Sequence, residues 1–183
     1  MAESTIGVAV LGTGFGQKVH IPGFQIHHRT QLVAVYHRDL SKAQAIATQH
    51  QIPHACDTVE QVLTLPDVDA VSIATPPFLH LPMATASLQA GKHILLEKPT
   101  ALTVAEARQI EQMAQQQGRI AGMDFEFRFV PAWQHLKALL AAGYVGQPRL
   151  VKVDWMVAGR ANPERAWSWY ARKDQGGGRL TLD

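Results

Sequence analysis

A glycine-rich turn near the start of the chain has the pattern of a phosphate-binding loop. It follows a continuous apolar stretch and precedes a segment that we expect to be helical. In dinucleotide-binding proteins the first glycine makes the tight turn, and the second lets the backbone approach the pyrophosphate beside the free amides of a helix N-terminus. The third fingerprint position is Gln17, not glycine, and a glycine-rich turn without a ligand is the alternative interpretation. The residues that we predict contact a dinucleotide here are Gly12, Thr13, Gly14, Phe15 and Gly16.

The residues after the second apolar run bear on which dinucleotide would bind. An acidic side chain at this position would bind both hydroxyls of the ribose and repel a 2′-phosphate. The sequence has His37 and Arg38 there, and the guanidinium of Arg38 suits a phosphate. We therefore expect both residues at the cofactor and favour NADP(H) over NAD(H), with a solvent-exposed Arg38 as the alternative. Asp39 is interpreted as the cap of the next helix.

Two further apolar runs end in polar residues, and open parallel sheets bind ligands at the carboxyl ends of their strands. One run leads into Thr75 and Pro76, and the next leads into Glu97 and Lys98. A lysine at the floor of a cleft could hydrogen-bond a substrate hydroxyl, assist its loss of a proton or hold a ribose. The alternative for Lys98 is an exposed ion pair with Glu97. For His80, spacing alone favours a packing role in a helix.

Short apolar runs alternate with helical patterns over the first 123 residues. This alternation predicts an α/β fold with a doubly wound parallel sheet that helices cover on both faces. We expect strands at 6–11, 32–36, 52–55, 70–74, 93–96 and 119–123. Helix caps are expected at Asp39 or Ser41, at an Asp57/Glu60 pair and at a Thr103/Glu106 pair.

The pattern changes after Met123, where we place a boundary between a dinucleotide-binding domain (1–123) and the incomplete start of a second domain (124–183). Pro131 begins a helix that Gly143 ends. Apolar residues then occupy every second position from 151 to 157, which predicts a half-buried strand of a mainly antiparallel sheet. Asp124, Glu126 and Arg128 also alternate, and we interpret them as an exposed or interdomain face, with the substrate cleft as the alternative.

The composition of the 183-residue chain excludes several classes of protein. It is 46% hydrophobic and 17% charged with a net charge of +2, which excludes a disordered polyelectrolyte and argues against a nucleic-acid or membrane partner. The single cysteine, Cys56, excludes an intrachain disulfide. Pro53 separates His50 from His54, and we predict no metal site. The short polar N-terminus and the lack of a membrane-length apolar run predict a cytoplasmic protein.

Residues 6 to about 178 resemble the N-terminal half of the Gfo/Idh/MocA family, which includes glucose–fructose oxidoreductase and inositol dehydrogenase. The resemblance implies a Rossmann domain followed by an α/β domain with a large open sheet. It also implies an NAD(P)-dependent oxidoreductase that transfers hydride between nicotinamide and a sugar- or polyol-type substrate, and homo-oligomers for a full-length form. The matching segments are Val8–Pro22, Ala74–His80, Gly91–Pro99, Arg128–Pro131 and Gly176–Gly178.

The same resemblance gives roles to the strand-end residues. Lys98 would be the active-site lysine with Glu97 beside it near the cofactor, and Pro99 would follow a cis peptide. The segment that borders the nicotinamide would contain Thr75, Pro76 and His80. By the resemblance, the family's substrate-side Asp and His would lie beyond residue 183. Because residues 124–183 are too few to complete the sheet of the second domain, we expect a folded Rossmann domain with an association-prone tail. A non-catalytic dinucleotide-binding module or an inactive fragment is the alternative function.

Overall fold

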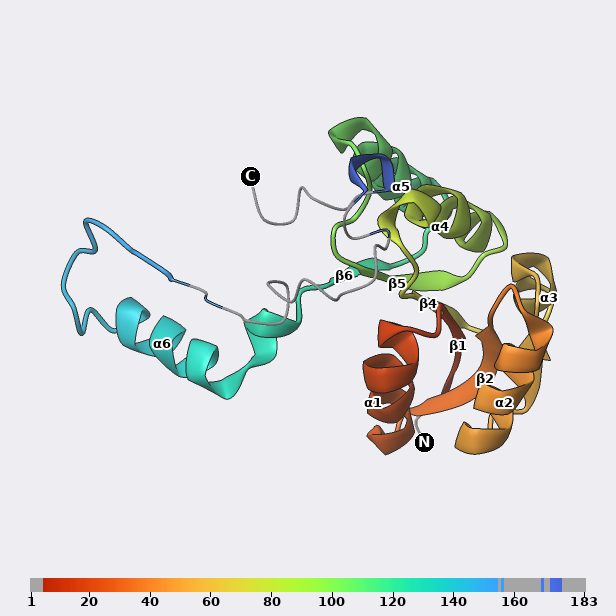
Figure 1. The fold of residues 1–183 in the computed structure, drawn as a ribbon. Helices are drawn as coiled ribbons and strands as arrows, with labels where there is room; N and C mark the ends of the chain where they lie inside the picture. Colours follow the sequence, from red (N-terminus) through yellow and green to blue (C-terminus); the bar gives the residue numbers. More distant parts are fainter. Residues whose placement is uncertain (1–4, 155, 157–168, 170–171, 176–183) are drawn as a thin grey trace. The chain divides into compact units, whose positions relative to one another are not determined.

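The computed structural model describes residues 5–154, 156, 169 and 172–175. Within them the chain divides into two compact units after Asp124 (Figure 1). The first unit holds the residues up to Asp124 together with Trp169 and residues 172–175, and the second begins at Phe125. All the candidate site residues lie in the first unit, which is therefore the unit that positions the site.

A six-stranded sheet forms the centre of the first unit. Neighbouring strands are parallel throughout, and their order is β3-β2-β1-β4-β5-β6. The chain builds outward from β1 in one direction, then crosses back and builds outward from β4 in the other, which is the predicted doubly wound arrangement. The strands are β1 (Ile6–Leu11), β2 (Thr30–Tyr36), β3 (His54–Cys56), β4 (Ala70–Ile73), β5 (His93–Glu97) and β6 (Ala121–Asp124).

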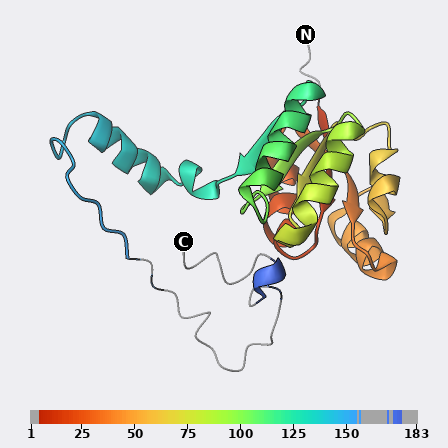
Figure 2. The same ribbon diagram turned by 90° about the horizontal axis from the view of Figure 1, so that it is seen from above.

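Helices cover both faces of the sheet, as Figure 2 shows, and each face has its own apolar core. Side chains alternate along β1, so Ala9 and Leu11 join one core and Val10 joins the other. The larger core includes residues of α3, α4 and α5, and the smaller includes residues of α1 and α2. These helices are α1 (Ile21–Ile26), α2 (Leu40–His50), α3 (Val59–Leu63), α4 (His80–Gln89) and α5 (Val104–Gln116). Among the described residues, no helix has the length and apolarity that crossing a membrane requires.

The predicted caps of α2 and α5 are present, whereas the predicted cap of α3 is wrong by one residue. Thr58, not Asp57, is the N-cap of α3, and its hydroxyl accepts a hydrogen bond from the amide of Gln61. The Gln61 side chain in turn accepts from the amide of Asp57. Thr58/Gln61 has the same spacing as the predicted Asp57/Glu60 pair, so spacing alone does not distinguish them.

In the second unit, η3 (Glu126–Phe129) precedes α6 (Pro131–Ala141), which begins at the expected proline. Residues 150–154 and 156 form no strand, and Val151 and Val153 are exposed. The predicted antiparallel sheet is therefore not shown, because an alternating sequence forms a stable strand only when it pairs with a neighbour. Trp155, Val157 and the Gly176–Gly178 triplet lie outside the described residues.

Candidate functional site

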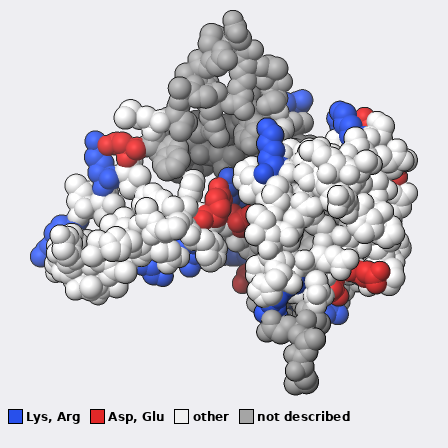
Figure 3. Space-filling view, turned by 90° about the horizontal axis from the view of Figure 1, so that it is seen from below, with Lys and Arg blue, Asp and Glu red and all other residues white. Residues whose placement is uncertain are grey.

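The predicted site residues gather at the carboxyl ends of the strands. Most of them lie in the loops that follow β1, β2 and β4. Glu97 is the last residue of β5, Lys98 follows it, and His80 is the first residue of α4. β1 lies beside β4, with Leu11 paired to Ile73, although the chain continues from these strands toward opposite edges of the sheet. Such a switch point is where open α/β sheets bind ligands. On the face drawn in Figure 3, acidic and basic side chains are interspersed among uncharged ones.

The three glycines of the turn after β1 have different surroundings. Gly12 has a φ of +102°, and a Cβ there would lie 2.5 Å from the carbonyl oxygen of Ala74. A Cβ on Gly16 would lie 3.0 Å from Cγ1 of Val10, so this glycine permits close packing on β1. A Cβ on Gly14 would meet nothing within 4 Å. Gly12 and Gly16 therefore serve the fold, whereas the space at Gly14 is open to an outside group.

The departure from the dinucleotide fingerprint at Gln17 has a structural counterpart. Gly16 begins η1 (Gly16–His20), a π-helical turn, and makes the close contact with the sheet that the third fingerprint glycine makes elsewhere. The side chain of Gln17 instead donates a hydrogen bond to Gln49. Gly16 thus takes over the packing role of the missing third glycine.

At the end of β2, the acidic residue is already engaged. The carboxylate of Asp39 accepts hydrogen bonds from the Ser41 hydroxyl at 2.6 Å and from the Ser41 amide at 3.1 Å. The Ser41 hydroxyl is the main cause that lowers the pKa of the Asp39 carboxyl from its ordinary value. Arg38 is exposed, and the amide of His37 donates to the carbonyl of Cys56. Arg38 is therefore exposed here, while Oδ1 of the equally exposed Asp39 is used in capping α2.

The fully buried ring of His80 connects two loops. Its Nε2 lies 2.9 Å from the carbonyl oxygen of Thr75, in the loop after β4. Its Nδ1 lies 2.9 Å from the carbonyl oxygen of Pro99, in the loop after β5, where the Lys98–Pro99 peptide is cis as expected. Because the ring is buried, any influence of His80 on a ligand would pass through these loops. The half-buried Pro76 lies between Thr75 and the short helix η2 (Pro77–Leu79).

Lys98 lies at the end of β5 with its side chain 40% exposed. Its Nζ is 4.0 Å from Oε2 of Glu97 and 5.7 Å from the ring centre of Phe15, so a cation–π contact joins it to the glycine turn. Glu97 itself is 6% exposed, and its Oε2 accepts a hydrogen bond from the amide of Lys98 at 3.1 Å. The predicted exposed ion pair is therefore only half right: the cation is exposed, but the carboxylate is buried.

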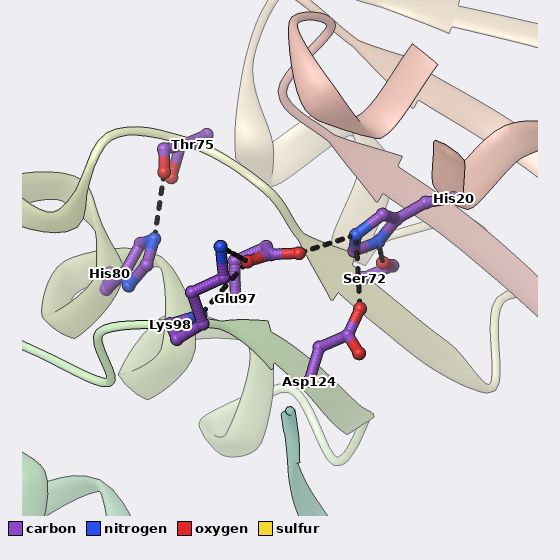
Figure 4. A network of polar contacts seen from close by, with 7 residues as sticks. All are labelled: His20, Ser72, Thr75, His80, Glu97, Lys98 and Asp124. Atoms are coloured by element: carbon purple, nitrogen blue, oxygen red, sulfur yellow. Dashed lines mark hydrogen bonds and ion pairs between the residues drawn. The ribbon is translucent and has the colours of Figure 1, made fainter. Parts of the chain in front are cut away.

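Sequence reasoning missed the buried His20, which lies beside Glu97 on the side away from Lys98 (Figure 4). Its Nδ1 lies 2.6 Å from Oγ of Ser72, and its Nε2 lies 3.0 Å from Glu97 and 3.4 Å from Asp124. These partners are 52 or more positions from His20 in the sequence, so no local motif could reveal them. Asp124, which the alternating pattern placed on an exposed or interdomain face, is half-buried and belongs to this cluster.

His20, Glu97 and Asp124 also form a nitrogen and oxygen donor set of the kind that metals prefer, since their donor atoms lie within 4.8 Å of one another. Sequence spacing predicted no metal site and did not reveal this cluster. The same donor atoms are within hydrogen-bonding or ion-pair distance of one another, so the cluster is satisfied by its own contacts.

A doubly wound parallel sheet with an open glycine turn at its switch point defines the class of Rossmann-type dinucleotide-binding proteins. The chain belongs to the oxidoreductase family with an NAD-binding Rossmann fold, Gfo/Idh/MocA, whose family model matches residues 6–125. This confirms the family resemblance found in the sequence.

Individual relatives agree with this assignment. An uncharacterized oxidoreductase of Synechocystis sp. is 53% identical over 94% of this chain and 47% of its own length. The D-glucoside 3-dehydrogenase of Escherichia coli is 31% identical over 98% of this chain and 51% of its own length. The crystal structure of an NAD binding oxidoreductase from Klebsiella pneumoniae superposes with a TM-score of 0.80 at 27% identity, over 95% of this chain and 48% of that one. The chain thus spans about half the length of the relatives that it matches.

Proposed function

We propose that this chain forms the cofactor half of an NAD(P)-dependent dehydrogenase or reductase that acts on a sugar- or polyol-type alcohol or carbonyl. The single observation that carries the proposal is the open space at Gly14, set at the switch point of the sheet and linked through Phe15 to Lys98. A side chain at Gly14 would occupy the space that a pyrophosphate needs, so the residues present fit a dinucleotide. A nicotinamide dinucleotide, when bound, supplies or accepts the hydride.

Three parts of the chain would have different roles in binding and catalysis. The turn from Gly12 to Gly16 would hold the pyrophosphate with its backbone amides. The loop after β4, with Thr75 and Pro76, would border the nicotinamide. Lys98 would hydrogen-bond the substrate oxygen and assist proton transfer, because its ammonium is exposed while its carboxylate partner is buried. A carbohydrate substrate is supported by the Escherichia coli relative, which is a D-glucoside 3-dehydrogenase.

Two measurements test the proposal. Fluorescence titration of this chain with NADPH and NADH should show saturable binding. In a polypeptide of the relatives' length that contains this chain, Lys98→Ala should lower kcat for a sugar or polyol by roughly 100-fold or more, with cofactor affinity little changed. Lys42→Ala, which removes an exposed lysine of α2, is the control and should keep full activity. Full activity of Lys98→Ala would contradict the proposed role, and failure to bind either cofactor would contradict the proposal as a whole.

We propose in addition that the cofactor is NADP(H). Arg38 is exposed at the end of β2, and the Asp39 carboxylate is occupied in capping α2. One oxygen of the acid at these two positions is thus used in the cap, and the cation beside it would attract a 2′-phosphate.

A further inference from the structure

His20 occupies a confined position between the glycine turn and the end of β5. The residue is 5% exposed, and its ring makes edge-on contacts with Phe15 and Phe24 at centroid distances of 5.5 Å and 6.4 Å. These two rings restrict how the imidazole can tilt, so its nitrogens have fixed directions. Each nitrogen has a polar partner: Ser72 faces Nδ1, and the carboxylates of Glu97 and Asp124 face Nε2.

The partners decide which nitrogen carries a proton. An ionised carboxylate only accepts hydrogen bonds, so Nε2, which faces two of them, must be a donor. The Ser72 hydroxyl can donate to or accept from Nδ1, so it suits the ring in either protonation state. His20 is thus held at one end by Ser72 and presents an N–H to Glu97 and Asp124 at the other.

Glu97 connects this ring to Lys98. Oε1 of Glu97 receives the hydrogen bond from His20, while Oε2 receives one from the amide of Lys98 and lies 4.0 Å from its Nζ. A nearly buried carboxylate keeps one orientation only while such donors satisfy it. The direction of Glu97, and with it the charge beside the Lys98 ammonium, therefore depends on His20.

We propose that His20 is a positioning residue that keeps the Glu97 carboxylate aimed at Lys98. The importance of Lys98 for catalysis rests on the proposed function, but the contact chain His20–Glu97–Lys98 does not. Without the N–H of His20, Oε1 of the nearly buried Glu97 would lose the hydrogen bond that orients it. It would turn away from this position, and the Lys98 ammonium would lose the nearby charge of Glu97.

The test follows the reactivity of Lys98 in this chain without any cofactor. In competitive acetylation with acetic anhydride, only the uncharged amine reacts, so a lysine that loses an ion-pair partner is labelled faster. Mass spectrometry compares the labelling of Lys98 with that of Lys42 in the same molecule. We expect His20→Leu to raise the relative labelling of Lys98 by about two- to fivefold, the range for loss of a partly exposed ion pair. His20→Gln, whose amide can donate toward Glu97, should restore labelling to near the wild-type level.

A double-mutant cycle separates positioning from a general loss of packing. Glu97→Gln should itself raise Lys98 labelling, and adding His20→Leu to it should change nothing further, because both act through one carboxylate. If His20→Leu does not fold, Ser72→Ala, which leaves the ring in place but removes its Nδ1 partner, should give a smaller shift in the same direction.

Three results would overturn the proposal. The first is unchanged Lys98 labelling in folded His20→Leu. The second is additivity with Glu97→Gln. The third is labelling that responds to added Zn²⁺ and to chelator but not to the substitutions, which would assign the cluster to a metal. Because no cofactor is used, failure here is distinct from failure of the dinucleotide titration that tests the proposed function.

Discussion

At the scale of single residues, the glycines of the turn after β1 are needed for two different reasons, the fold and the ligand, which the sequence motif alone does not distinguish. Gly12 has a backbone conformation that side chains rarely adopt and lies against the backbone of Ala74. Gly14 has neither constraint. The fold thus needs a glycine at position 12, whereas only a ligand would need one at position 14.

We therefore predict that Gly14→Val folds normally but loses dinucleotide binding. The valine enters open space in the free protein, so the melting temperature should stay near that of the wild type. It would occupy the place of the pyrophosphate, so NADPH affinity should fall by about tenfold or more, the equivalent of 1.4 kcal/mol. Thermal unfolding and fluorescence titration measure the two effects separately.

Gly12→Val is the matched variant with the opposite expectation. Its Cβ would lie 2.5 Å from the carbonyl oxygen of Ala74, directly after β4, so the free energy of unfolding should fall by about 1–3 kcal/mol. Unchanged NADPH binding in Gly14→Val would remove the main support for the cofactor site, whatever Gly12→Val does.

The preference for NADP(H) is tested at Arg38. Arg38→Ala should weaken NADPH binding by about tenfold while leaving NADH binding nearly unchanged, since a charge-assisted hydrogen bond to the 2′-phosphate contributes about 1.5–3 kcal/mol. Arg29→Ala, at an exposed site before β2, is the control. Tighter binding of NADH than NADPH by the wild type would contradict the preference.

At the scale of secondary-structure elements, the stability that the Asp39 cap gives to the start of α2 depends on pH, and the direction of this dependence is known. Hydrogen bonds lower the pKa of the Asp39 carboxyl below its ordinary value of 3.8. The capping contribution is thus fully present above 3.8 and is lost as the pH falls through the lower pKa of the folded protein. We predict that Asp39→Ala lowers the melting temperature at pH 7 and that the difference from the wild type shrinks below about pH 3.8.

Asp39→Asn provides the control for this measurement. Its amide oxygen can still accept from the Ser41 amide, but it does not titrate. Its stability relative to Asp39→Ala should therefore be independent of pH. A constant difference between wild type and Asp39→Ala down to pH 2 would show that the charge of Asp39 contributes nothing.

The elements also show what sequence reasoning can reach. The strands and most helix caps follow from local patterns, because burial on both faces gives continuous apolar runs and a cap acts within four residues. The strand expected at 151–157 depends on a partner that the described residues do not supply. The contacts of His20 with Ser72 and Glu97 depend on the parallel register of β1, β4 and β5, which only the folded sheet provides.

At the scale of the whole molecule, both apolar cores consist of residues that precede Asp124. We predict that a chain ending at Asp124 keeps its cooperative unfolding and its dinucleotide binding. It should also be more soluble than the 183-residue chain, because it lacks the exposed side chains of Phe125, Phe127 and Phe129. Calorimetry, NADPH titration and solubility at matched pH measure these properties.

A chain ending at Met123 is the comparison for this truncation. It lacks the last residue of β6 and the Asp124 contact with His20, so it should melt at a lower temperature than the chain ending at Asp124. Loss of cooperative unfolding in the longer of the two would show that the first unit needs residues beyond its own cores.

The buried ring of His80 has a kinetic consequence. Because one imidazole contacts both the carbonyl of Thr75 and the carbonyl of Pro99, the loops after β4 and β5 cannot open independently without breaking a contact on that ring. Amide hydrogen exchange in the two loops should therefore slow together when a ligand orders either one. In His80→Phe the two exchange rates should respond separately.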